Sequence, residues 1–207
     1  MGQMFLQSEQ YLDQLDDGMY AEIGSSRHGD GGSTAIIADW ANRRGRRLFT
    51  VDIDPVNSQQ IIELNIPNVF VHTGTGEDWL TSRIKKYSLE ESRIAFLYLD
   101  NFDWDWHPEW DPPETFILEQ QNRYKDLGFQ MNNVNSQRAH LAQMMLALPL
   151  MAERSIVACD DTWYNEYWGH YTGKSGAVIP FLLNNGYEVL VTQSDPVYGT
   201  ILGRGIK

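Results

Sequence analysis

The stretch AEIGSSRHGDGGST, residues 21–34, joins the end of an apolar segment to a glycine-rich turn and the start of a helical pattern. An apolar run that ends at an acidic residue is typical of a buried parallel strand whose carboxyl end faces a ligand crevice. Backbone amides in such a turn can approach an anionic or polar ligand at a helix N-terminus. The stretch therefore predicts a strand, a binding turn and a helix of an α/β domain.

The same ending recurs three times along the chain, in LFTVDIDP (48–55), AFLYLDN (95–101) and SIVACDDTW (155–163). Helical patterns separate these segments, which predicts a mostly parallel sheet with helices on both faces. The last two apolar segments, YEVLVTQ and YGTILGRG, predict an antiparallel pair that closes the chain. The fold class expected is α/β, Rossmann-like and doubly wound.

The length of 207 residues predicts a single domain over residues 1–207. Residues 101–135 interrupt the alternation of strands and helices with a segment rich in Trp and Pro, followed by a polar helical pattern. We interpret residues 101–135 as a lid or insertion, because long irregular segments in compact domains commonly serve that role.

Charge and composition restrict the partners. The net charge of −12 disfavours a nucleic-acid partner, because phosphate backbones would be repelled. The basic NRRGRR at 42–47 is interpreted as a solvated helix end. The longest apolar stretch, at 141–152, is too short to cross a bilayer of about 30 Å, so no membrane partner is expected. The sequence has a single cysteine, Cys159, and no signal-peptide pattern, so we expect a cytoplasmic protein. The expected partner is a small-molecule acceptor. Whether the protein forms a homo-oligomer is left open.

Two features indicate cofactor binding. Asp52 ends the second strand, where a carboxylate can accept both hydroxyls of a ribose. GTGEDW at 74–79 closes the third strand and is either an adenine-side turn or an ordinary strand–helix turn. The glycines at 24, 29, 31 and 32 do not fit the G-x-G-x-x-G spacing of dinucleotide enzymes.

Three carboxylates indicate a metal. Asp100, Asp160 and Asp161 follow neighbouring strands and would repel each other unless a cation neutralises them. Hard oxygen ligands suit Mg²⁺, which predicts a magnesium site at this edge. The alternative is that one acid caps a helix and another is solvated.

Three further motifs are less specific indicators of function. GKS at 173–175 lacks the upstream glycine of a phosphate-binding loop. His140 lies on a helical pattern and is either a satisfied helix histidine or a general base. The aromatic TWYNEYWGHY at 162–171 is either ordinary packing or the wall of a substrate pocket.

On these motifs the chain resembles class I S-adenosylmethionine-dependent methyltransferases, and among them the metal-dependent small-molecule O-methyltransferases of the macrocin and cephalosporin-cluster type. The resemblance covers about residues 19–100 and 136–203, and it implies a seven-stranded sheet with an antiparallel terminal strand. It also implies S-adenosylmethionine and Mg²⁺ as cofactors. The cofactor residues it implies are Glu22, Gly24, Ser25, Ser26, Asp52, Ile53, Gly74, Thr75 and Asp100. The metal ligands it implies are Asp100, Asp160 and Asp161.

The resemblance implies methyl transfer to a hydroxyl of a sugar or phenol, with magnesium assistance. Asp100, Asp160 and His140 are the catalytic candidates, and the base is His140, His107 or none, since a metal can activate the hydroxyl. Two alternatives stay open: a nicotinamide-dependent oxidoreductase, and a non-catalytic cofactor-binding accessory protein on the same fold.

Overall fold

The computed structural model describes residues 4–27, 29–109, 112–193 and 198–207. Among these residues, seven strands form one sheet in the order β3-β2-β1-β4-β5-β9-β8. The strands are β1 (Met19–Ile23), β2 (Leu48–Asp52), β3 (Val69–Thr73), β4 (Ile94–Leu99), β5 (Met151–Asp160), β8 (Glu188–Gln193) and β9 (Gly199–Arg204). β1 to β5 pair in parallel, whereas β9 runs antiparallel to both β5 and β8. The predicted mostly parallel sheet with an antiparallel terminal strand is confirmed.

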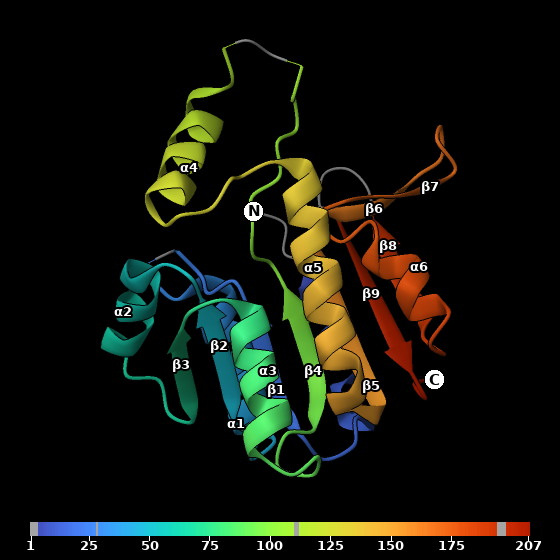
Figure 1. Cartoon of the computed structure of the whole chain (residues 1–207). Coiled ribbons are helices and arrows are strands. Elements are labelled where there is room, and N and C mark those ends of the chain that lie inside the picture. Colours follow the sequence, from blue (N-terminus) through green and yellow to red (C-terminus); the bar gives the residue numbers. More distant parts are fainter. Residues whose placement is uncertain (1–3, 28, 110–111, 194–197) are drawn as a thin grey trace.

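Helices cover both faces of this sheet (Figure 1). They are η1 (Met4–Gln14), α1 (Gly32–Arg43), α2 (Pro55–Glu63), α3 (Gly76–Lys86), α4 (Thr115–Asp126), α5 (Asn133–Ala147), η2 (Leu148–Leu150) and α6 (Val178–Leu183). In Figure 1, α3, α5 and α6 lie in front of the sheet and α1 lies behind it. Side-chain caps start several of these helices: Asp54 accepts from Val56 N, Thr75 from Asp78 N, and Asn132 from Asn135 N.

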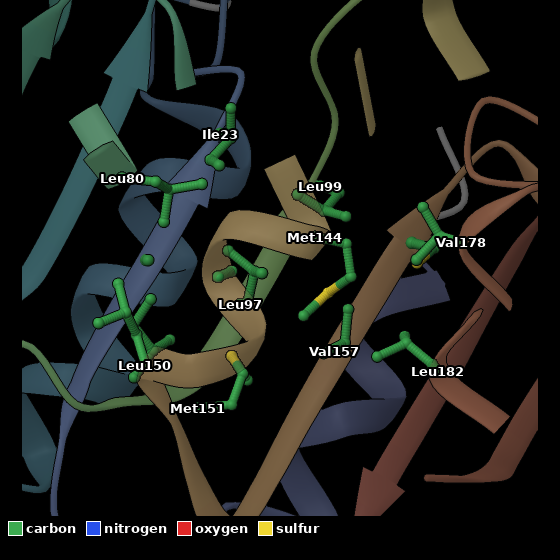
Figure 2. Packing of buried hydrophobic residues seen from close by; sticks show 14 of the residues in the cluster. Ile23, Leu80, Leu97, Leu99, Met144, Leu150, Met151, Val157, Val178 and Leu182 are labelled. Carbon is green, nitrogen blue, oxygen red and sulfur yellow. The ribbon is translucent and has the colours of Figure 1, made fainter. Parts of the chain in front are cut away.

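Alternation along the central strands divides the core between the two faces. Phe96 of β4 packs with Trp40 of α1 on one face. Leu97 packs on the other face, where Figure 2 shows it near Met144 of α5 and Val157 of β5. Successive strand residues point to opposite faces, so a strand buried on both faces is apolar at almost every position. The uninterrupted run of β4 follows from this burial.

Several predicted boundaries need correction. The sequence of residues 4–17 predicts an N-terminal helix, which in the structure is a 3₁₀ helix ending at Gln14. The sequence of residues 136–153 predicts a helix that packs on the sheet, but this helix ends at Ala147, because Pro149 cannot continue it, and β5 already begins at Met151. The segment 162–171 contains most of an unpredicted hairpin, β6 (Thr162–Asn165) paired with β7 (His170–Gly173).

Within residues 101–135, the polar pattern forms α4, which Figure 1 shows beyond the carboxyl ends of the parallel strands. Residues 110 and 111 of this segment lie outside the described residues. Over the described part of the chain, no helix is long and apolar enough to cross a membrane.

Replacing Leu97 by Ala tests the buried face of β4. Leu97 is fully buried, so Leu97→Ala should lower the free energy of unfolding by about 3–4 kcal/mol. Leu89→Ala is the matched control, because Leu89 is 63% exposed. Urea unfolding of both variants is the measurement, and equal losses in the two would contradict the assignment of the core.

Candidate functional site

A cavity lies at the carboxyl edge of the sheet, between the ends of β1, β2 and β4 and helix α4. This is the edge at which open α/β sheets bind ligands. Six of the predicted cofactor residues line the cavity: Gly24, Ser25, Asp52, Ile53, Gly74 and Asp100. The strand ends therefore bring together residues that are up to 76 positions apart in the chain.

Gly24 makes a close approach between backbones at the cavity floor. Its φ is +100°, and an added Cβ would lie 2.5 Å from Asn101 N. The amide of Asp100 donates to the carbonyl of Ile23 at 2.9 Å, so the ends of β1 and β4 are in direct contact here. Only glycine fits this position, because any side chain would overlap the backbone of Asp100 and Asn101.

Asp52 presents a buried carboxylate to the cavity. Its Oδ1 accepts from Asp54 N at 2.7 Å and its Oδ2 accepts from Asn57 Nδ2 at 3.2 Å. Burial raises the pKa of Asp52 above its ordinary value. The backbone of Ser25 also hydrogen-bonds this carboxylate, so about one of its roughly four lone-pair positions remains available for a hydroxyl of a ribose.

A second hollow adjoins the cavity and is lined by Ile53, Thr75, Asn101 and residues of α5. Asn101 Oδ1 is buried and has no hydrogen-bond partner within the described part of the chain. An unpaired buried acceptor is costly, so this oxygen suits a donor group on a bound ligand. Thr75 Oγ1 caps α3 by accepting from Asp78 N at 3.0 Å.

Glu22 lies beneath the cavity rather than in its lining. Its carboxylate is fully buried and accepts from the hydroxyls of Ser33, Thr34 and Thr50 at 2.6–2.7 Å. Burial raises its pKa to about 7, although these three hydrogen bonds act in the opposite direction. Glu22 thus connects β1 to β2 and α1 and acts on a ligand only through its neighbours.

Ser26, predicted as a cofactor residue, donates its amide to Thr34 Oγ1 at 3.0 Å.

Helix α4 covers the cavity and is held there by polar contacts. Arg123 donates to Asp54 Oδ2 at 2.5 Å and to Asn57 Oδ1 at 2.7 Å, which anchors α4 to the start of α2. On the other side, Arg27 donates to both oxygens of Asp103 and to Gln120 Oε1. Sequence reasoning missed Arg27 and Arg123, because nothing local marks a contact between segments this far apart.

The three acids predicted to bind magnesium do converge, but around a lysine. Lys174 Nζ lies 2.8 Å from Asp100 Oδ1, 2.9 Å from Asp161 Oδ2 and 3.5 Å from Asp160 Oδ2. The lysine side chain is 5% exposed, so the three carboxylates enclose its ammonium. Among the described residues, no group of three or more His, Cys, Asp and Glu side chains is arranged to hold a metal ion.

This cluster shifts the pKa values of its members in different directions. Burial alone would raise the pKa of Asp100, but the charge of Lys174 together with hydrogen bonds from Asp160 and Lys174 holds that pKa below its ordinary value. Burial and the charge of Asp100 raise the pKa of Asp160 well above its usual range. Burial would lower the pKa of Lys174, yet Asp100 and Asp161 raise it well above the ordinary value, so the lysine stays charged.

His140 lies in the core behind the cavity and does not line it. It is fully buried, with Nδ1 2.6 Å from Ser175 Oγ and Nε2 2.5 Å from the carbonyl of Asn101. Burial lowers its pKa to about 4. Both ring nitrogens are engaged, so the geometry favours the satisfied-histidine interpretation over the predicted base. His107, the other candidate base, has a 44% exposed side chain near Glu109 and Glu114.

Aromatic residues from three segments gather beside the hairpin. Trp163 of β6 stacks on Trp106 at 5.1 Å between ring centroids, and Tyr198 packs against both rings. The cluster joins the 101–135 segment to the predicted aromatic stretch, so packing accounts for Trp163. Tyr167 and Trp168, at the hairpin tip, remain exposed.

No family model and no curated protein matches this chain. Solved structures do match it across nearly its whole length. A TDP-rhamnose 3'-O-methyltransferase of calicheamicin biosynthesis, CalS11, is 14% identical with a TM-score of 0.56, covering 98% of this chain and 77% of its own. An rRNA methylase from Streptococcus thermophilus is 13% identical with a TM-score of 0.53, covering 99% and 98%. The O-methyltransferase NovP is 9% identical with a TM-score of 0.55, covering 97% and 78%. At these identities the likeness shows the fold alone, which is the Rossmann-like fold of these methyltransferases.

Glu22 generates a prediction about pH. A group whose pKa is raised on folding contributes stability below its unfolded value of 4.5, and this contribution is lost as the pH rises through about 7. Glu22→Gln mimics the neutral form, so wild type should lose about 3 kcal/mol relative to this variant between about pH 4 and pH 8. Urea unfolding at several pH values measures the difference, and a pH-independent difference would refute the prediction.

Arg123 generates a prediction about α4. Removing its charge-assisted hydrogen bonds in Arg123→Ala should lower the local stability of residues 115–126 by about 1–2 kcal/mol, roughly a 5- to 30-fold faster amide exchange. Lys125→Ala, an exposed position on the same helix, is the control and should leave exchange unchanged. Hydrogen–deuterium exchange of the cofactor-free protein measures both. Equal protection of α4 in wild type and Arg123→Ala would show that other contacts hold the helix.

Proposed function

We propose that this protein is an S-adenosylmethionine-dependent methyltransferase that transfers a methyl group to a hydroxyl of a small molecule. The observation that supports it best is the cavity at the carboxyl edge, where Gly24, Asp52 and Gly74 line one hollow. Methyltransferases of small molecules are among the proteins that share the fold.

The residues present fit this cofactor. Gly24 lines the cavity where the ends of β1 and β4 approach closely, Asp52 has an acceptor position for the ribose, and Asn101 Oδ1 is an acceptor with no partner among the described residues, in the hollow that Ile53 and Thr75 also line. When bound, S-adenosylmethionine supplies a methyl group on a positively charged sulfur. Asp100 lines the cavity and its pKa is held low, so its ionised carboxylate suits this positive charge.

The acceptor is proposed to approach from the side of Asp160 and Lys174, next to the hairpin. Positioning the hydroxyl in line with the methyl group supplies much of the rate. Asp160 is the candidate to receive the hydroxyl proton, because its pKa is raised and its side chain is 22% exposed. Magnesium assistance, which the resemblance implies, is not part of this proposal, since Lys174 lies between the three carboxylates.

A small-molecule acceptor is favoured over RNA by charge. The chain carries a net charge of −12, and acids cluster where the acceptor would arrive. A nucleic acid would be repelled from such a surface. The nicotinamide alternative is disfavoured by the glycines at 24, 29, 31 and 32, whose spacing does not fit the G-x-G-x-x-G of dinucleotide enzymes.

Asp52 tests the cofactor assignment. Asp52→Ala should weaken binding of S-adenosylhomocysteine by about 1–3 kcal/mol, roughly 5- to 150-fold, because ribose hydroxyls lose their acceptor. Asp39→Ala, on the exposed face of α1, is the control. Calorimetric titration measures both, with NADH as the competing ligand. Binding of NADH but not of S-adenosylhomocysteine would reject the proposal, and unchanged affinity in Asp52→Ala would reject the ribose contact alone.

Turnover separates the enzyme from an accessory protein. Transfer of a labelled methyl group from S-adenosylmethionine to a panel of sugars and phenols should yield product that Asp160→Asn reduces strongly. Cofactor binding without transfer to any hydroxyl acceptor would favour the accessory alternative.

A further inference from the structure

The buried lysine has the position that a bound cation would have. Lys174 Nζ is within 3.5 Å of one oxygen from each of Asp100, Asp160 and Asp161, and its side chain is 5% exposed. An ammonium has three N–H donors, and three carboxylates face it. The acids therefore already have a cation among them, supplied by the chain itself.

The backbone on either side of Lys174 is shaped to hold it there. Gly173 has a φ of +90°, and an added Cβ would lie 1.8 Å from the carbonyl oxygen of Asp161. The amide of Lys174 donates to this same oxygen at 3.0 Å. Asp161 itself has a φ of +43°, so a tight turn after β5 presents its carbonyl to the end of β7. No residue but glycine fits at position 173, and the contact sets the lysine beside the acids.

Ser175, the residue after Lys174, holds the same segment in place through two further hydrogen bonds. Ser175 N donates to Thr162 Oγ1 at 2.9 Å, and Ser175 Oγ lies 2.6 Å from His140 Nδ1. Thr162 Oγ1 in turn donates to the carbonyl of Asp160 at 2.8 Å. The Gly-Lys-Ser stretch, whose spacing excludes a phosphate-binding loop, thus has a different role: each of its three residues contacts the acidic turn or its support.

We propose that Lys174 is a built-in cation that takes the place of a divalent metal at this site, and that the three carboxylates bind such a metal only when Lys174 is removed.

Size and charge both support this. Divalent ions bind carboxylate oxygens at about 2.0–2.6 Å, so an ion and the ammonium cannot share the space between these acids. Without the lysine, Asp100, Asp160 and Asp161 would face one another unneutralised, which disfavours the empty site. Their oxygens, now 2.8–3.5 Å from a common point, would need to move by only about an ångström to reach bonding distance. This inference goes beyond the proposed function and does not depend on the methyl acceptor.

The test is binding of Mn²⁺ to the whole chain without cofactor or acceptor, measured as loss of the free-ion signal in electron paramagnetic resonance. Wild type is compared with Lys174→Ala, with Asp161→Asn and with the double variant Lys174→Ala/Asp161→Asn. Asn tolerates the positive φ at position 161, so this change removes charge with little backbone strain. Lys86→Ala, an exposed lysine at the end of α3, is the control for loss of a positive charge.

Lys174→Ala should bind one Mn²⁺ at least about tenfold more tightly than wild type and Lys86→Ala, and Asp161→Asn should remove this gain. The melting temperature of Lys174→Ala should rise with Mn²⁺, while that of wild type should not. Saturable binding to wild type that Asp161→Asn abolishes would overturn the proposal, and so would a folded Lys174→Ala that binds no better than wild type.

Lys174→Gln, which keeps the length of the side chain without its charge, covers the case in which Lys174→Ala does not fold. A variant that folds only when Mn²⁺ is added supports the proposal. Failure of both variants to fold with or without Mn²⁺ contradicts it, because the carboxylates would then be unable to accept a metal in place of the lysine.

Discussion

The charge of Lys174 is the constraint on which the carboxyl edge of the sheet depends. Asp100 follows β4, Asp160 ends β5 and Asp161 begins the turn into the hairpin, so their mutual repulsion would otherwise act between adjacent strand ends. A buried ion pair is weak evidence for net stability, since desolvation offsets most of the attraction. Loss of one partner is different, because it leaves an uncompensated charge at a cost of about 3–5 kcal/mol. The cluster therefore fixes the arrangement of strand ends more than it adds stability.

The site and the core share the same strands. Leu99 is fully buried in the core, and the next residue, Asp100, lines the cavity. At the end of β5, Cys159 is likewise buried in the core and is followed by Asp160, which faces Lys174. The apolar residues hold each strand between two helical layers, so the polar residue that follows has little freedom of position. This coupling explains why residues far apart in sequence converge without a long loop to carry them.

The strand ends could be predicted from sequence because each signal is local: an apolar run followed by an acid. Asp52 is predicted from this signal, Gly24 and Gly74 are predicted from the turns that follow two strands, and the structure brings all three to one cavity. The contacts of Lys174 could not be predicted from a local signal. Its carboxylate partners are 13 to 74 positions away, and the sequence of the intervening hairpin has no clear period. The segment GKS does not fit the phosphate-binding loop, the known motif that it resembles most. Gly173, with its positive φ, instead allows the close contact with the carbonyl of Asp161. Arg123 and Asp54 raise the same difficulty, being 69 positions apart.

A lysine in place of a metal changes what the site can offer an acceptor. A metal ion can exchange a bound water for a substrate oxygen, whereas the three N–H donors of Lys174 each face a carboxylate and its side chain is almost inaccessible. In the proposed reaction the acceptor would meet instead the outer side of Asp100, Asp160 and Asp161, whose side chains are 22–29% exposed. Ionised carboxylates accept hydrogen bonds and donate none, so such a surface suits a ligand that carries a donor, such as the proposed hydroxyl. The lysine limits the repulsion between the acids, and under this proposal the carboxylates would orient an O–H bond where a metal would otherwise have bound it.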